Sequence, residues 1–270
     1  DGGIRVKGDV AAEHGRITIA AKKELAVEGD ITAKGGTVTM EAGRDLTVTG
    51  TTYTEGDTTL KAANDVKVDA DLTTDSGNLT ILADSDLDGQ GSFLQKEGTT
   101  VQTTTFGDIT IQSSGVSTLA NIVPAGSLTL EKAGAEVTYT QQPDSHVQIG
   151  ASVTIQAGVT LAAANATYTI YQDWINYGTF DPGTSFVELV GSNESFVFGN
   201  NAFNDFSIIQ PGKTVHFQSG AIQEVSGVLT LKGGFASPLI LSSTDVNVPW
   251  KINPLGAYEI GYVDMYNAMN

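Results

Sequence analysis

The strongest constraint in this sequence is a repeat of about 21 residues that runs through roughly its first third. Within each repeat, apolar and polar residues alternate in three short runs, and glycine, aspartate or asparagine separates the runs. Alternation with a period of two is typical of β-strands rather than helices. The equivalent pairs of the first run are Ile17 and Ile19, Val38 and Met40, Thr58 and Leu60, and Leu79 and Ile81. Strands this short cannot bury an apolar face alone, so each coil must stack on the next, and the repeat predicts a β-solenoid.

Two further sets of positions follow the same register. The second contains Leu25, Leu46, Val66 and Leu87, and the third contains Ile31, Thr52 or Tyr53, Leu72 and Phe93. If successive coils stack at ~4.8 Å, the second set forms a continuous aliphatic ladder inside the solenoid. Connections between parallel strands are right-handed, so the predicted fold class is all-β, a right-handed parallel β-helix. An antiparallel sandwich, the alternative, has no reason to repeat at a fixed length.

The repeat is regular in one part of the chain and irregular in the other. Residues 1–97 form the regular coils, and residues 98–270 read as longer coils with loops. Residues 94–106 are expected to be an inserted loop, because they separate Phe93 from the next clear strand at 108–111. No linker divides the two parts, so we expect a single β-solenoid domain over 1–270 with about 12 to 13 coils.

The amino-acid composition of the chain limits the classes of molecule that it is expected to bind. The chain has 14 basic and 31 acidic residues, a formal net charge of −17 and no cysteine. This balance disfavours nucleic acid and anionic membrane surfaces as partners. The chain contains no apolar run long enough to span a membrane, so we expect no membrane insertion. Because the sequence starts at Asp1 without methionine, we interpret it as a slice of a longer protein.

Several phrases resemble a known family. The strings GDITI (107–111), GNLTI (77–81) and RDLTVTG (44–50) are similar to the coils of filamentous-haemagglutinin-type surface proteins. The segment 203–234 and the string IGYVDM (260–265) resemble a recurrent part of giant repetitive surface proteins from environmental bacteria. The resemblance implies a right-handed parallel β-helix in a very large protein that is secreted or held at the bacterial cell surface. It carries no catalytic motif that could be transferred to this chain.

One string suggests a metal site. Asp84, Asp86 and Asp88, followed by Gly89, match the start of a calcium loop, in which alternate carboxylates surround a hard cation. The twelfth position of such a loop would be Gln95 rather than the expected glutamate. The alternative is that Leu87 belongs to the core ladder, which would make Asp86 and Asp88 outward-facing strand residues. No cofactor is expected apart from calcium as a candidate.

Aromatic residues and histidines supply the other candidates. Half of the chain's aromatic residues lie between positions 168 and 206. Tyr171, Trp174 and Tyr177 could form a platform for glycans, since sugar rings stack on tyrosine and tryptophan. The alternative is that aromatic residues fill wider coils. The three histidines, at 14, 146 and 216, have no metal-ligand spacing, and alternation places His216 on the solvated outer surface.

These observations favour a non-enzymatic, extracellular structural or adhesive β-solenoid, a rod or filament component at a bacterial cell surface. One alternative is a polysaccharide lyase or hydrolase on a β-helix scaffold, although no pair of acids recurs across the coils. Others are a glycan-binding module or a threonine-rich surface that binds ice or mineral. The expected partners are further coils of the same polypeptide, other copies stacked end to end, and cell-surface glycans. We expect no catalytic residues.

Overall fold

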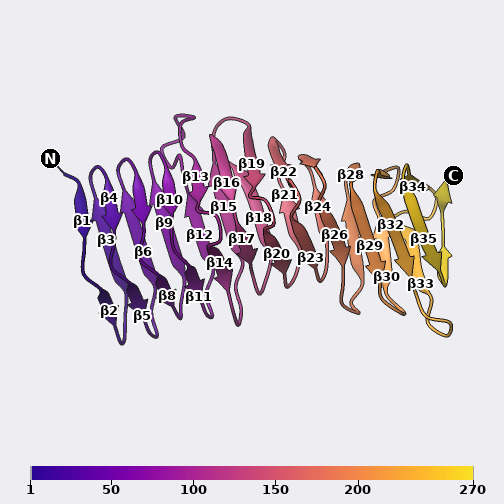
Figure 1. The fold of residues 1–270 in the computed structure, drawn as a ribbon, viewed down its shortest axis with the longest axis horizontal. Helices are drawn as coiled ribbons and strands as arrows, with labels where there is room; N and C mark the ends of the chain where they lie inside the picture. Colours follow the sequence, from indigo (N-terminus) through magenta and orange to yellow (C-terminus); the bar gives the residue numbers. More distant parts are fainter. Residues whose placement is uncertain (1, 270) are drawn as a thin grey trace.

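The computed structural model describes residues 2–269, which fold into an elongated stack of parallel β-coils with the two ends of the chain at opposite ends of the stack (Figure 1). The stack has about 13 turns of about 21 residues, and residues 2–269 contain no helix. Every strand pairs in parallel with the strand three places further along the chain, except across one break. The predicted parallel β-solenoid is therefore confirmed, and its right-handedness stays a prediction.

Each coil contributes one strand to each of three faces, here called A, B and C. Face A is a nine-stranded sheet followed by a four-stranded sheet, with the break between β25 and β28. Its strands are β1 (Ile4–Val6), β4 (Leu25–Val27), β7 (Leu46–Val48), β10 (Val66–Val68), β13 (Phe93–Gln95), β16 (Val116–Leu119), β19 (Val137–Gln141), β22 (Val159–Ala162), β25 (Thr179–Asp181), β28 (Asn201–Phe203), β31 (Ile222–Val225), β34 (Trp250–Pro254) and β37 (Ala268–Met269).

Faces B and C are uninterrupted sheets of 12 strands each. Face B contains β2 (Val10–Ala12), β5 (Ile31–Ala33), β8 (Thr52–Thr54), β11 (Leu72–Thr74), β14 (Thr100–Thr103), β17 (Asn121–Val123), β20 (His146–Ile149), β23 (Thr167–Ile170), β26 (Phe186–Leu189), β29 (Asp205–Ile209), β32 (Val228–Lys232) and β35 (Ala257–Gly261). Face C contains β3 (Ile17–Ala21), β6 (Val38–Ala42), β9 (Thr58–Ala62), β12 (Leu79–Leu82), β15 (Ile109–Ser113), β18 (Leu128–Lys132), β21 (Val153–Ile155), β24 (Trp174–Asn176), β27 (Ser195–Phe198), β30 (Thr214–Phe217), β33 (Leu239–Ser243) and β36 (Val263–Met265).

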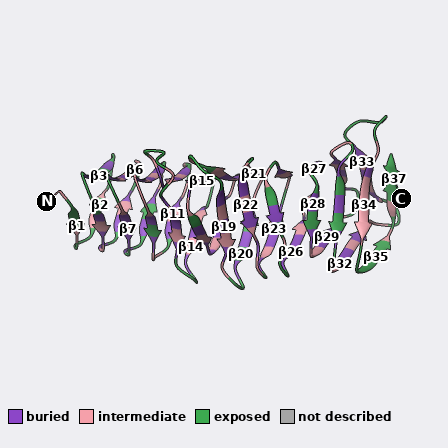
Figure 2. Cartoon of the chain, turned by 90° about the horizontal axis from the view of Figure 1, so that it is seen from above, coloured by how far each residue is buried: buried purple, intermediate pink, exposed green. Residues whose placement is uncertain are grey.

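The core is built from ladders of like residues, because the parallel register places each inward side chain over its equivalent in the next coil. On face C, the ladder contains Met40, Leu60, Ile81, Ile111, Leu130 and Ile155, all of them fully buried. Burial of each such side chain stabilises the fold by about 1.5–3 kcal/mol. Buried residues follow the interior of the strands, whereas exposed ones gather at the corners and at the C-terminal end (Figure 2).

Corner carboxylates and amides tie successive coils together, which accounts for the aspartates and asparagines between the apolar runs. The Oδ1 atom of Asp57 accepts the backbone N–H of Asn78 at 2.8 Å, and Oδ1 of Asn78 accepts that of Asp108 at 2.9 Å. The Oδ1 atom of Asp108 in turn accepts the N–H of Ser127 at 2.7 Å. Each corner side chain thus satisfies a backbone donor that would otherwise have no partner in the sheet.

The expected register is wrong in the fourth coil. Val66 pairs with Phe93 rather than Leu87, and Leu72 pairs with Val101 rather than Phe93. The inserted loop therefore covers residues 83–92, and the segment predicted as a loop contains β14 and the last two residues of β13. Leu87 is 60% exposed and has a φ of 63°. Sequence alternation missed this because the inward positions of β13 and β14 include polar residues as well as apolar ones.

The last coil leaves inward-facing positions uncovered. Tyr258 and Ile260 pair with the buried Leu229 and Leu231, yet they are 64% and 49% exposed. Strands β35 and β37 are correspondingly exposed in Figure 2. Apolar ladder positions of this kind are normally covered by a neighbouring coil. No helix capable of crossing a membrane is found among the described residues.

Candidate functional site

The loop at 83–92 brings the three predicted metal ligands together. Asp84 is fully buried and has a φ of 58°, whereas Asp86 and Asp88 are exposed. One carboxylate oxygen from each lies within 4.8 Å of the others. These aspartates are therefore not outward-facing strand residues, because the chain leaves face C at this point and turns back on itself.

The buried carboxylate of Asp84 has a structural role of its own. It accepts a short hydrogen bond from the Ser114 hydroxyl, and the backbone N–H of Gly89 reaches both of its oxygens at 3.2 Å. Gln95 is buried on face A, where its Nε2 donates to the carbonyls of Thr99 and Asn121, so it is not a ligand of this loop. Calcium needs about six to eight oxygen ligands. Three carboxylates could supply part of this set, and calcium binding stays a prediction.

The prediction that Trp174 belongs to a surface platform for glycans is wrong. Trp174 is fully buried, and its ring lies 4.7 Å from that of Phe180 and 5.3 Å from that of Phe203, measured between centroids. Its indole N–H donates to the side chain of Asn201 at 2.8 Å. The side chain therefore fills the interior of a wide coil, which was the alternative interpretation of this aromatic segment.

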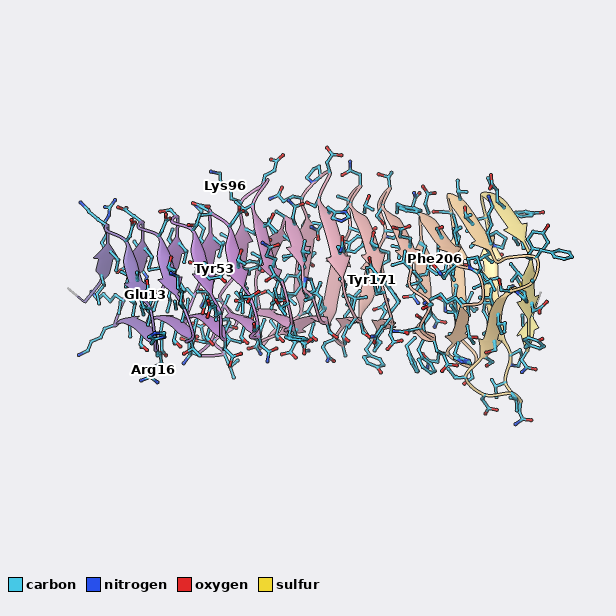
Figure 3. The ribbon with its side chains drawn as sticks, turned by 90° about the horizontal axis from the view of Figure 1, so that it is seen from below. Glu13, Arg16, Tyr53, Lys96, Tyr171 and Phe206 are labelled. Carbon is cyan, nitrogen blue, oxygen red and sulfur yellow. The ribbon has the colours of Figure 1, made fainter. Side chains whose placement is uncertain are left out.

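The two tyrosines remain at the surface, at opposite ends of β24. Tyr171 is 41% exposed at the corner between faces B and C, and Tyr177 is 58% exposed at the corner between faces C and A. Figure 3 labels Tyr171 in the middle part of the stack. Each tyrosine lines its own hollow, of about 400 Å³ for Tyr171 and about 230 Å³ for Tyr177. They are separate surface features rather than one platform.

A buried lysine is a feature that sequence reasoning missed. Lys213 is fully buried, and its Nζ donates to the backbone carbonyls of Val190, Gly191 and Asn193 at 3.0, 3.0 and 2.8 Å. Burial lowers the pKa of Lys213 to about 8, and the carboxylate of Asp173 opposes this shift. The ammonium group caps an irregular corner of the preceding coil, so it is not an accessible base.

His216 is also more constrained than expected. Its Nδ1 lies 2.6 Å from the Ser242 hydroxyl, and its Nε2 lies 2.5 Å from the Glu194 carboxylate. The imidazole stacks on Phe196 with ring centroids 5.1 Å apart, and 23% of the side chain is exposed. His14 and His146 are exposed. Register alone explains the alignment, because Phe196 pairs with His216 and His216 pairs with Ser242 in successive coils.

The hydroxyl, imidazole and carboxylate have the connectivity of a nucleophile, a base and an orienting acid. Acyl transfer also requires hydrogen-bond donors for the developing oxyanion. The N–H of Thr244, which follows shortly after Ser242, already donates to the carbonyl of Phe217 at 2.9 Å. The arrangement thus links three coils, and the N–H of Thr244 is already engaged in the sheet.

Comparison with known proteins gives one match. Residues 12–77 match the family model described as hemagglutinin repeat, and this stretch lies within the regular coils. No curated protein matches the chain, and no solved structure matches it either.

Proposed function

We propose that this chain, whose residues 12–77 match the hemagglutinin repeat model and whose fold is a parallel β-solenoid, is a rigid, non-enzymatic rod with a structural or adhesive role at a bacterial cell surface. The observation that carries this proposal is the uninterrupted pairing of faces B and C along the whole stack. Every coil is held to its neighbours by parallel ladders, so bending requires many backbone hydrogen bonds to open together. At ~4.8 Å per coil, about 13 turns extend roughly 60 Å.

The chemistry of the exposed side chains supports a non-enzymatic role. The haemagglutinin repeat family is typically non-enzymatic. A polysaccharide lyase or hydrolase needs acids and a base that meet in an accessible cleft. In residues 2–269, the only group of three acids placed to share a ligand is the one at Asp84, and it lies in a loop. Lys213 is buried, and His216 is engaged on both ring nitrogens.

Surface location is tested on cells of the native organism. Antibodies raised against the purified chain should label intact cells or material they release, and scattering in solution should give an elongated particle. Labelling that appears only after the cells are permeabilised would contradict the surface proposal. A compact particle in solution would contradict the rod.

The proposal that the chain has no enzymatic activity is tested by a separate experiment. We expect a fluorophosphonate probe, which reacts with activated serines, to leave Ser242 unmodified. We also expect incubation with acidic and neutral polysaccharides to yield no cleavage products. Labelling of the wild-type chain that disappears in Ser242→Ala, or polysaccharide cleavage that follows the purified protein, would show that the chain is an enzyme.

A further inference from the structure

The hollow beside Tyr171 crosses four successive coils at the edge of face B. Its volume is about 400 Å³, which lies in the range of small-molecule sites. The residues of this hollow that matter here are Gln102, Thr104, Val123, Pro124, Gln148 and Tyr171. They come from the ends of β14, β17, β20 and β23 and from the corners that follow these strands.

Pro124 explains why the surface opens at this point. Proline has no N–H to donate to a sheet ladder. Strand β17 therefore ends at Val123, and its register with β20 is limited to Ile122 and Val147, followed by one backbone bond from the Gly150 N–H to the Pro124 carbonyl at 3.0 Å. The corners also shorten from residues 104–108 to 150–152 in successive coils, so the surface recedes between them.

A glycine next to the tyrosine leaves the aromatic ring accessible. Ile149 pairs with Ile170, so Gly150 occupies the position in the preceding coil that corresponds to Tyr171. A Cβ atom at Gly150 would collide with the backbone carbonyl of Ala125, so this position requires glycine. Because Gly150 has no side chain, nothing from this position covers the tyrosine ring on the side of the hollow.

The polar groups of the hollow suit a neutral ligand rich in hydroxyls. Gln102 and Gln148 each offer a carbonyl acceptor and an amide donor. Nε2 of Gln102 donates to the Thr73 hydroxyl at 3.1 Å, which orients this side chain. All residues that line the hollow are uncharged. A phosphate or carboxylate would find no cation there to offset its desolvation.

We propose that this hollow binds a neutral pyranose unit of a glycan, with the apolar face of the sugar stacked on Tyr171 and its hydroxyls bonded to Gln102 and Gln148. Amphipathic rings of tyrosine suit such contacts, because a pyranose has an apolar C–H face and polar edges. The proposal rests on the adhesive function proposed above and gives that function a ligand class.

The test uses saturation-transfer NMR and calorimetry with methyl mannoside, lactose and maltotriose as neutral probes, and sialyllactose and oligogalacturonate as acidic ones. At least one neutral probe should bind, with the saturation located on the C–H face of one pyranose. Tyr171→Ala should weaken this binding about tenfold or more, corresponding to ~1.4 kcal/mol, whereas Tyr171→Trp should retain it. Gln148→Ala should weaken it severalfold.

Tyr177→Ala is the matched control, because it removes an exposed tyrosine from a different corner of the same coil region. Circular dichroism and thermal melting establish that each variant folds. The proposal is wrong if no neutral probe binds, if acidic probes bind better, or if Tyr171→Ala binds as the wild type does. Cell-surface labelling and the elongated shape do not depend on Tyr171. A negative result for the glycan site therefore leaves the proposed rod function intact, and the two failures can be told apart.

Discussion

At the scale of single residues, polar groups enter the interior where another coil supplies their partner. Asn201 accepts from the indole of Trp174 and donates to Gln223 at 2.7 Å, and both contacts cross between coils. Lys213 follows the same rule with three carbonyls from the preceding coil. Such groups stabilise the stack only as a set, since a buried polar atom without its partner costs about 1–3 kcal/mol.

Lys213 should therefore be important for stability. Lys213→Met keeps the aliphatic stem and removes the ammonium group, which leaves three carbonyls without a donor. We expect the free energy of unfolding to fall by about 2 kcal/mol, measured by chemical denaturation. Lys132→Met, at an exposed lysine, is the control and should change stability by less than ~0.5 kcal/mol. Equal effects of the two substitutions would contradict this role.

Alkaline titration should separate two opposing effects. Burial lowers the pKa of Lys213 from its ordinary 10.5 to about 8, so between these values the unfolded chain binds the extra proton and the contribution of Lys213 to stability rises with pH. Burial raises the pKa of Tyr139 and Tyr168 well above the ordinary 10.0. Above that value, the unfolded chain releases protons that the folded chain keeps, so stability falls.

Substitutions of Lys213 and Tyr168 should separate the rise in stability with pH from the fall. Lys213→Met should abolish the rise between about pH 8 and 10, and Tyr168→Phe should reduce the fall above pH 10. The measurement is the free energy of unfolding at closely spaced pH values. Profiles of wild type and variants that run parallel would mean that these groups do not titrate differently on folding.

At the scale of the elements, corner side chains act as clamps between strands of neighbouring coils. Asp173, just before β24, accepts the N–H of Phe196 at 2.9 Å through Oδ1 and the Ser152 hydroxyl at 3.0 Å through Oδ2. It therefore joins three coils of face C. Asp57, Asn78, Asp108 and Ser127 make the equivalent contact to a backbone N–H of the following coil, so short polar side chains at this corner secure much of this edge of the stack.

Replacing this clamp should weaken the stack locally. Asp173→Ala removes both acceptors and should reduce the free energy of unfolding by about 1–2 kcal/mol. Asp173→Asn keeps an acceptor at the Oδ1 position and should lose less than half as much. Hydrogen exchange should report faster exchange of the Phe196 amide in the alanine variant. If alanine and asparagine are equivalent, the hydrogen bond to Phe196 is not the stabilising contact.

At the scale of the whole molecule, the two ends of the stack differ in charge. Residues 1–23 contain five basic and three acidic side chains, whereas residues 245–270 contain one basic and three acidic. The C-terminal coil also exposes Tyr258 and Ile260 in line with the core ladders. Complementary charge and uncovered apolar positions both favour contact between the C-terminal end of one copy and the N-terminal end of another.

We predict that the isolated chain associates end to end with concentration. Sedimentation velocity should show elongated oligomers, and the double substitution Tyr258→Lys with Ile260→Lys should shift them to monomers, since lysine opposes apolar stacking and meets the basic end of the next copy. Tyr177→Lys, away from both ends, should associate as the wild type does. A monomer at every concentration, or a double variant that associates normally, would contradict end-to-end contact.

The solenoid could be predicted from the sequence because the information is local and repeated: alternation defines each strand, and the fixed spacing aligns ladders such as Met40, Leu60 and Ile81. Only the tertiary structure decided which residues are in contact in the coils where the repeat length changes.

Leu87 lies in a loop, Trp174 points inward, and Pro124 lines a hollow beside Tyr171. Lys213 meets its carbonyls, and His216 meets Ser242 and Glu194, across 20 to 26 residues of variable coil length. Such neighbours are set by the stacking of coils, and no local pattern records them, because each coil's length shifts the register of those that follow.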